Sequence, residues 1–408
     1  MQPTITVIPA YPYLGAQKAS LDVLFRVKTP ANPAPSLERT PIHFILAIDV
    51  SGSMSGKGIA HAKRAAQFFV EQLRPTDTVG IVTFADGARV LRPLGAVDNL
   101  TDMLTLIEEL KANGGTDLHG GISLAYKEFE KVTGTRRVIV LTDGNPTVGN
   151  QKPNDILAVT KQAQVQQVVT SVFGMGTEFN EILMQQMAQN GDGNYYFIES
   201  PEQLSGIFEQ EFKLASNVVG QNVVLDFSKT ANVKINTVYN LFKLEGQRIL
   251  ELPNLQMDRS FDVLCKLDFE HQGKDSFGMV ELVWFWEGET HRVPVEIVLP
   301  QVIVADWESQ PVEPEVQTRK SLLTVASNQV KIAEAIQVGD YAVAEALFSS
   351  SEGLISNMDN PESRMLKRSL SVAKADLAEG SISKMSKGLR YASYSTSRSS
   401  APDPQDEA

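Results

Sequence analysis

A carboxylate and two hydroxyls occupy alternate positions in residues 49–53, whose sequence is D-V-S-G-S. The apolar run 43–48 precedes them and is typical of a buried parallel strand, and an amphipathic helical pattern follows. In open α/β sheets ligands bind at the carboxyl ends of the strands, so we expect Asp49, Ser51 and Ser53 to line one crevice. Such hard oxygen donors suit Mg²⁺ or Mn²⁺ better than Zn²⁺.

Two further loops contain oxygen donors of the same kind. Residues 113–117 read N-G-G-T-D and come before a helical run, and a second apolar strand over 136–142 ends in Asp143. By itself, each loop has a more common explanation, because glycine pairs and Asp-Gly sequences occur in ordinary turns. Their joint occurrence at strand ends in an alternating strand-helix pattern favours a metal site.

The three segments, in this order and spacing, resemble the von Willebrand factor A domain over roughly residues 40–216. The resemblance implies a doubly wound, Rossmann-like α/β fold with a metal ion-dependent adhesion site. In that family the two serines and either the threonine or the second aspartate bind the ion directly, the others act through water, and a carboxylate of a partner protein completes the coordination. Carried onto this sequence, the metal-site residues are Asp49, Ser51, Ser53, Thr116 and Asp143.

Composition narrows the class of protein. A chain of 408 residues should form two or three domains, and its net charge of −12 argues against nucleic acid or an anionic membrane as a partner. The one cysteine, Cys265, excludes a disulfide framework and is expected to be a buried core thiol. The first residues lack a signal-peptide pattern, and no apolar run is long enough to span a membrane, so we expect a cytoplasmic protein.

Strand-like, twofold patterns flank the A domain on both sides. In the segment 1–36 the residues Leu21, Val23, Phe25 and Val27 alternate with polar ones, which predicts a half-buried strand ahead of a proline-rich linker. Several short strands follow over 218–304 and predict a β-sandwich that looks incomplete alone. We therefore expect the first segment to complete the sandwich, with the A domain inserted between its two parts.

The rest of the chain is expected to be helical. Apolar residues with a period near 3.6 predict a helical bundle over 316–394, and the Ser-, Pro- and acid-rich stretch 395–408 predicts a disordered tail.

These features together predict a non-enzymatic, metal-dependent protein-interaction module. The five histidines are scattered, and neither H-E-x-x-H nor G-x-S-x-G occurs, so no catalytic residue is assigned. The expected ion is Mg²⁺, with Mn²⁺ or Ca²⁺ as alternatives, and the expected partner is a protein that presents an Asp or Glu. Residues near the motif that could contact this partner are Met54, Lys57, His119, Asn145, Pro146 and Lys152.

Two other functions remain open. The protein could be a structural scaffold, or an adaptor of a separate AAA+ ATPase of the MoxR or chelatase type, because the chain has no Walker motif of its own. The inserted arrangement is also similar to bacterial proteins related to the inter-alpha-trypsin inhibitor heavy chains.

Overall fold

The computed structural model describes residues 2–14, 18–31, 41–143, 145–175, 179–198, 203–230, 232–270, 275–300 and 311–398. The chain forms two compact units. Unit 1 combines Met1–Pro35 with Val218–Ala408, and unit 2 is Ser36–Asn217. One unit is therefore inserted in the sequence of the other, as the change of pattern along the chain predicts.

Unit 2 is built on a six-stranded sheet with the strand order β5-β4-β3-β6-β7-β8. All neighbouring strands are parallel except β5, which runs antiparallel to β4 at one edge. The inner strands are continuous apolar runs because both of their faces are covered by helices. The strands are β3 (Ile42–Asp49), β4 (Thr78–Phe84), β5 (Ala88–Ala96), β6 (Thr135–Thr142), β7 (Val168–Met175) and β8 (Asp192–Ile198).

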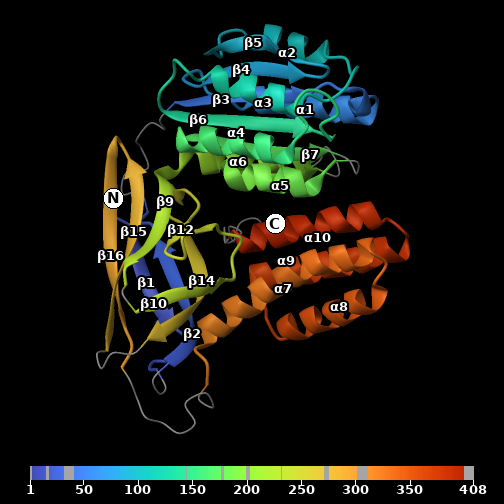
Figure 1. Ribbon diagram of the computed structural model, residues 1–408. Coiled ribbons are helices and arrows are strands. Elements are labelled where there is room, and N and C mark those ends of the chain that lie inside the picture. The colour runs from blue at the N-terminus through green and yellow to red at the C-terminus, as the bar shows by residue number, and fades with distance from the viewer. Residues whose placement is uncertain are drawn as a thin grey trace. The chain divides into compact units, whose positions relative to one another are not determined.

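Two groups of helices cover this sheet (Figure 1). On one face the Phe44 ring of β3 packs against Phe69 of α1 and Phe212 of α6, with centroids 4.9 and 5.5 Å apart. On the other face α3, α4 and α5 contact one another and the strands. The doubly wound fold is thus confirmed. The helices are α1 (Lys57–Glu71), α2 (Leu100–Glu108), α3 (Leu118–Lys127), α4 (Pro153–Val165), α5 (Glu181–Asn190) and α6 (Leu204–Ser216), with a short 3₁₀ turn η1 (Gly52–Met54).

Unit 1 contains a β-sandwich to which both of its sequence segments contribute. One sheet has the order β1-β2-β14-β10, so β2 lies between β1 and β14 and the amino-terminal strands complete the sandwich as expected. The other sheet has the order β11-β12-β9-β15-β16, and β13 pairs with β9. The main strands are β1 (Thr4–Pro9), β2 (Lys18–Lys28), β9 (Val218–Lys229), β10 (Val233–Val238), β14 (Ser260–Glu270), β15 (Ser276–Trp286) and β16 (Glu289–Val298); the short ones are β11 (Leu244–Glu245), β12 (Ile249–Glu251) and β13 (Leu255–Gln256). Cys265 is wholly buried in the core between the sheets, and burial raises the pKa of its thiol to about 12.

The prediction that β2 is half-buried is wrong. Leu24, which points away from the Leu21 face, is as buried as its apolar neighbours. The second face is covered by α7 (Pro314–Gln337), from which Lys320 donates a 2.7 Å hydrogen bond to Asp22 and Glu315 pairs with Arg26. The alternation predicts one solvent-facing side for this strand, but Asp22 and Arg26 on that side are ion-paired to α7.

The predicted helical bundle is confirmed. It consists of α7, α8 (Tyr341–Ile355), α9 (Pro361–Ala378) and α10 (Ile382–Ser397). The expected start of a disordered tail at residue 395 is too early, because the carbonyls of Thr396 and Ser397 accept hydrogen bonds from Arg319 and Asn240, both of 3.0 Å, and the helix continues. Positions 399–408 of that predicted tail lie outside the described residues.

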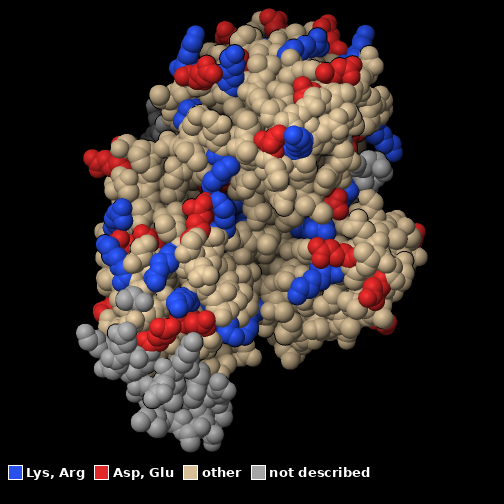
Figure 2. Space-filling model, viewed as in Figure 1, with Lys and Arg blue, Asp and Glu red and all other residues tan. Residues whose placement is uncertain are grey.

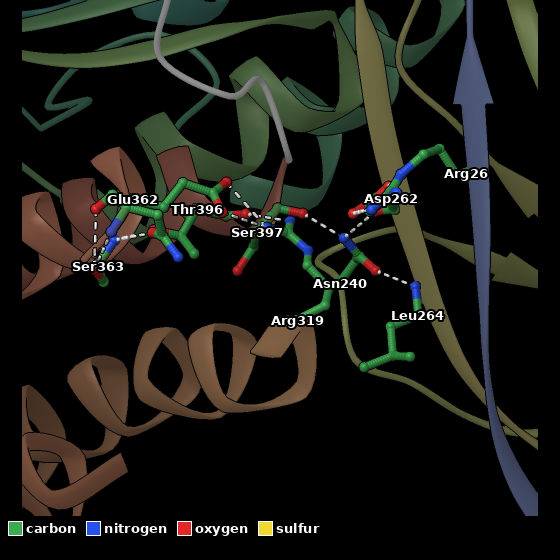
Figure 3. A network of polar contacts seen from close by, with 10 residues as sticks. Arg26, Asn240, Asp262, Leu264, Arg319, Glu362, Ser363, Thr396 and Ser397 are labelled. Atoms are coloured by element: carbon green, nitrogen blue, oxygen red, sulfur yellow. Dashed lines mark hydrogen bonds and ion pairs between the residues drawn. The ribbon is translucent and has the colours of Figure 1, made fainter. Parts of the chain in front are cut away.

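A polar network joins the bundle to the sandwich within unit 1 (Figure 3). Arg319 of α7 makes two 2.9 Å hydrogen bonds to the carboxylate of Glu362 at the start of α9 (Pro361–Ala378). The Asn240 amide contacts Ser397 on one side and, on the other, accepts a 2.8 Å hydrogen bond from the backbone of Leu264 in β14. Bundle and sandwich are therefore joined through specific polar groups.

The described helices give no sign of a membrane span: each is too short or too polar to cross a bilayer. On the face seen in Figure 2, Lys and Arg side chains are interspersed with Asp and Glu, with no basic patch, which fits the overall charge of −12.

Candidate metal centre

Asp49 is the last residue of β3 and is wholly buried. Its Oδ1 accepts a 2.8 Å hydrogen bond from the Ser51 backbone N–H, and its Oδ2 accepts one of 2.6 Å from the Thr142 hydroxyl. Thr142 ends β6, the parallel neighbour of β3. Parallel strands that start in register also end at the same edge, so the two side chains meet at the carboxyl edge of the sheet.

Ser51, Ser53 and Asp143 continue the same hydrogen-bonded chain. The Ser51 and Ser53 hydroxyl oxygens are 2.9 Å apart, and the Ser53 hydroxyl donates a 2.9 Å hydrogen bond to Oδ1 of Asp143. The turn η1 begins directly after Ser51 and carries Ser53 back toward the end of β6. Four of the five predicted residues are thus brought together, although Asp143 is 90 positions from Ser53 along the chain.

The loop with the sequence N-G-G-T-D lies against the first loop. The Gly52 N–H donates a 2.8 Å hydrogen bond to the Gly114 carbonyl, and the Asn113 N–H donates one of 2.8 Å to the Val50 carbonyl. Gly114 has φ +80°, and a Cβ there would come within 2.5 Å of the Asp86 carboxylate, so only glycine fits.

The fifth predicted residue, Thr116, is buried in this second loop. Its backbone N–H donates a 2.8 Å hydrogen bond to the Thr147 hydroxyl. The hydrogen bonds that join the other four predicted residues do not include the Thr116 hydroxyl. The structure therefore places Thr116 on the adjoining loop without linking its side chain to theirs.

The two carboxylates of this group, Asp49 and Asp143, are buried. Burial raises the pKa of Asp49, against the opposing effect of its hydrogen bonds from Thr142 and Ser51. Burial also raises the pKa of Asp143 to about 6; the Ser53 hydrogen bond lowers it and the charge of Asp49 raises it further. In the described part of the chain neither carboxylate is ion-paired with a lysine or arginine. Buried carboxylates of this kind favour either a proton or a bound cation.

The donor set decides which cations fit. It consists of two carboxylates and three hydroxyls, which suit Mg²⁺, Mn²⁺ or Ca²⁺ better than Zn²⁺. Within the described ranges, no three His, Cys, Asp or Glu side chains are grouped so that they could hold a metal, and at this site only two carboxylates come together, so the hydroxyls would have to supply the other ligands.

The prediction of residues that could contact a partner is wrong at one position. Met54 is wholly buried beneath the turn and cannot reach a partner. His119 and Pro146 are half-buried, whereas Lys57, Asn145 and Lys152 are exposed.

Sequence reasoning missed the residues that hold the site loops in place. Asp86 accepts a 2.6 Å hydrogen bond from the Gly115 N–H, Thr147 holds the backbone of Thr116, and Thr142 holds Asp49. The only signal for Thr142 was its place next to Asp143, and a threonine at the end of a strand is usually read as a strand former.

Comparisons with known proteins indicate a family for unit 2. Residues 44–210 match the family model described as the von Willebrand factor type A domain. The uncharacterized protein YfbK of Escherichia coli is 29% identical over 205 residues, covering 49% of this chain and 36% of YfbK. The uncharacterized protein sll0103 of Synechocystis is 27% identical over 322 residues, covering 74% of this chain and 76% of sll0103.

A bovine relative and a solved structure extend the comparison. Inter-alpha-trypsin inhibitor heavy chain H4 of Bos taurus is 27% identical over 169 residues, which are 39% of this chain and only 18% of H4. The von Willebrand factor type A structure from Catenulispora acidiphila superposes with a TM-score of 0.73 at 18% identity, covering 90% of this chain and 89% of that one. This likeness covers both units, so it extends the shared fold beyond the inserted domain. The matched residues, the doubly wound sheet and the loops at its carboxyl edge identify this chain as a protein with a von Willebrand factor type A domain.

Proposed function

We propose that unit 2 binds one divalent ion, Mg²⁺ or Mn²⁺, through Asp49, Ser51, Ser53, Thr116 and Asp143, and uses it to bind a protein partner. The observation that carries the proposal is the continuous hydrogen-bonded group of two buried carboxylates and two serine hydroxyls without a cationic side chain. A divalent cation would compensate two negative charges that burial otherwise disfavours.

Each residue has a defined part in this proposal. The serine hydroxyls supply oxygen ligands, and Ser53 can keep its proton directed to Asp143 because a hydroxyl oxygen has lone pairs to spare. Asp49 is held by hydrogen bonds to both of its oxygens and anchors the first loop. Thr116 supplies the third hydroxyl from the neighbouring loop. When bound, the ion supplies positive charge that attracts a carboxylate from outside.

The expected partner is a protein with an exposed Asp or Glu. Mg²⁺ prefers six oxygen ligands, and five side chains that act partly through water leave a position for an incoming carboxylate. A protein with a net charge of −12 would repel an acidic partner without the ion, so the ion would also decide when binding occurs.

Titration calorimetry on the full chain tests the ion. We expect one Mn²⁺ or Mg²⁺ per chain, because an all-oxygen ligand set suits these ions better than Zn²⁺. Asp49→Ala should abolish Mn²⁺ binding. Asp98→Ala is the matched control, because the Asp98 side chain is 77% exposed and away from these loops, and it should bind as the unchanged protein does. Equal Mn²⁺ affinity in Asp49→Ala would refute the assignment.

The partner is tested by affinity capture in three arms: the full chain with Mg²⁺, the full chain with EDTA, and Asp49→Ala with Mg²⁺. A partner of the proposed kind is retained in the first arm only, and loses binding when its contacting Asp or Glu is replaced by Ala. A specific partner that is retained equally in all three arms would show that the chain is a scaffold whose site has no part in recognition.

A further inference from the structure

Thr142 is not one of the five predicted metal-site residues, but its side chain is hydrogen-bonded to one of them, Asp49. Its hydroxyl donates 2.6 Å to Oδ2 of Asp49, and both side chains are wholly buried. At 2.6 Å the bond lies in the range of charge-assisted O–H···O⁻ contacts, which are the stronger ones.

The backbone fixes this contact from both sides. β3 and β6 pair in register through Ile48 and Leu141, so Asp49 and Thr142 are the next residues along two neighbouring strands. Oδ1 of the same carboxylate accepts the Ser51 N–H, which belongs to the loop that carries the serines. Because each oxygen accepts one hydrogen bond, the carboxylate of Asp49 is held against rotation. Its bond to the Ser51 N–H also fixes the start of the loop that carries the two serines.

We propose that Thr142 is a positioning residue for the divalent ion: its hydroxyl orients the carboxylate of Asp49 and thereby the serine ligands. The inference rests on the proposed metal function. A polar partner that orients a ligand in this way typically changes metal affinity by about 10–100-fold when it is removed.

The hydroxyl of Thr142 orients Asp49, whereas its methyl group only fills space in the core. Valine has nearly the same shape as threonine but no donor, so Thr142→Val leaves Oδ2 of Asp49 without this hydrogen bond. Serine keeps the donor and removes the methyl group. The two variants therefore separate orientation of the carboxylate from filling of the core.

The matched control is Thr170→Val. Thr170 is also wholly buried in the same sheet, in β7 (Val168–Met175), and its hydroxyl lies 2.9 Å from the hydroxyl of Tyr126 instead of near the site. This variant loses a buried threonine hydroxyl with no connection to Asp49.

The experiment measures Mn²⁺ affinity by calorimetry and thermal unfolding in EDTA for the full chain and the three variants. We expect Thr142→Val to bind Mn²⁺ at least about tenfold more weakly, Thr142→Ser to stay within about threefold of the unchanged protein, and Thr170→Val to keep its affinity. If Thr142→Val does not fold, Thr142→Ala takes its place with the same expected loss.

Thr142→Val that unfolds earlier in EDTA but binds Mn²⁺ with unchanged affinity would overturn the inference, because Thr142 would then support only the fold. An equal loss in Thr142→Ser would also overturn it, since the hydroxyl would not be the active group. If the unchanged protein binds no Mn²⁺, the proposed function itself fails and the inference falls with it.

Discussion

Two polar clusters of this protein, one in each unit, balance their carboxylates in opposite ways. In unit 1 the carboxylates of the network in Figure 3 each have an arginine: Asp262 pairs with Arg26 and Glu362 with Arg319. In unit 2 the carboxylates of Asp49 and Asp143 are hydrogen-bonded to hydroxyls and amides only. In the first network each carboxylate is neutralised by an arginine, and the ion pairs hold distant segments together. The second has two carboxylates that receive hydrogen bonds from hydroxyls and amides, and the proposed divalent ion would compensate their charge.

The two units also differ in how many segments of the chain build them. The site in unit 2 is built from loops of one continuous segment, whereas the sandwich of unit 1 needs β2 (Lys18–Lys28) between β1 and β14. We therefore expect the units to respond separately to most changes.

Removal of residues 1–35 should have the largest effect. The apolar side chains of β2 are almost completely buried, so without them β14 exposes its core face and the chain 36–408 should aggregate. The fragment 36–217 should fold and bind Mn²⁺ as the full chain does. Tryptophan fluorescence follows the loss directly, because all three tryptophans lie between residues 284 and 307, within unit 1. A cooperative transition of 36–408 at the urea concentration of the full chain would refute this.

Arg319→Met should destabilise unit 1 by about 3 kcal/mol, because it leaves Glu362 without its cation and the end of α10 (Ile382–Ser397) without a donor. Urea unfolding followed by tryptophan fluorescence measures the change. Lys374→Met is the matched control: its pair with Glu352 is about half exposed, so it should cost about 0.5 kcal/mol or less. Mn²⁺ affinity should be unchanged in both variants, and a loss in Arg319→Met would mean that the two networks are coupled.

The pH dependence of metal-free unit 2 should run against the usual direction for a carboxylate. The pKa of Asp143 is raised from 3.8 to about 6 in the folded domain. Between these two pH values Asp143 is therefore mostly ionised in the unfolded chain but still protonated in the folded domain. The free energy of unfolding of fragment 36–217 in EDTA should therefore fall between these two values, by about 1 kcal/mol after solvent screening. Mn²⁺ affinity should rise over the same range. Asp143→Asn should flatten this part of the profile, and an unchanged slope would assign it to another group.

Gly58→Ala should have the smallest effect and should act on the site alone. A Cβ at Gly58, in the first turn of α1 (Lys57–Glu71), would lie 3.1 Å from Oδ2 of Asp143, so the carboxylate must shift. We expect Mn²⁺ affinity to fall about threefold, or about 0.6 kcal/mol. Gly206→Ala in α6 (Leu204–Ser216) is the control, because nothing lies within 4 Å of its Cβ. Equal affinities in the two variants would show that Asp143 tolerates displacement.

The sequence alone was sufficient for the fold class and for most of the candidate site. Continuous apolar runs that alternate with helical periods specify a doubly wound sheet, and its strand ends then bring Asp49, Ser51, Ser53 and Asp143 to one edge. These features are local in sequence or follow from parallel pairing, so the pattern of residue types determines them. Whether the five residues hold an ion stays a prediction.

Only the tertiary structure decided which partners those residues have. Thr142 reads as a strand former until β6 lies beside β3 and its hydroxyl meets Asp49. The face of β2 that carries Asp22 and Arg26 reads as solvent-facing until α7 covers it. In both cases the cause is a contact between segments far apart in the chain, and the period of a strand records which side a residue points to but not what covers that side.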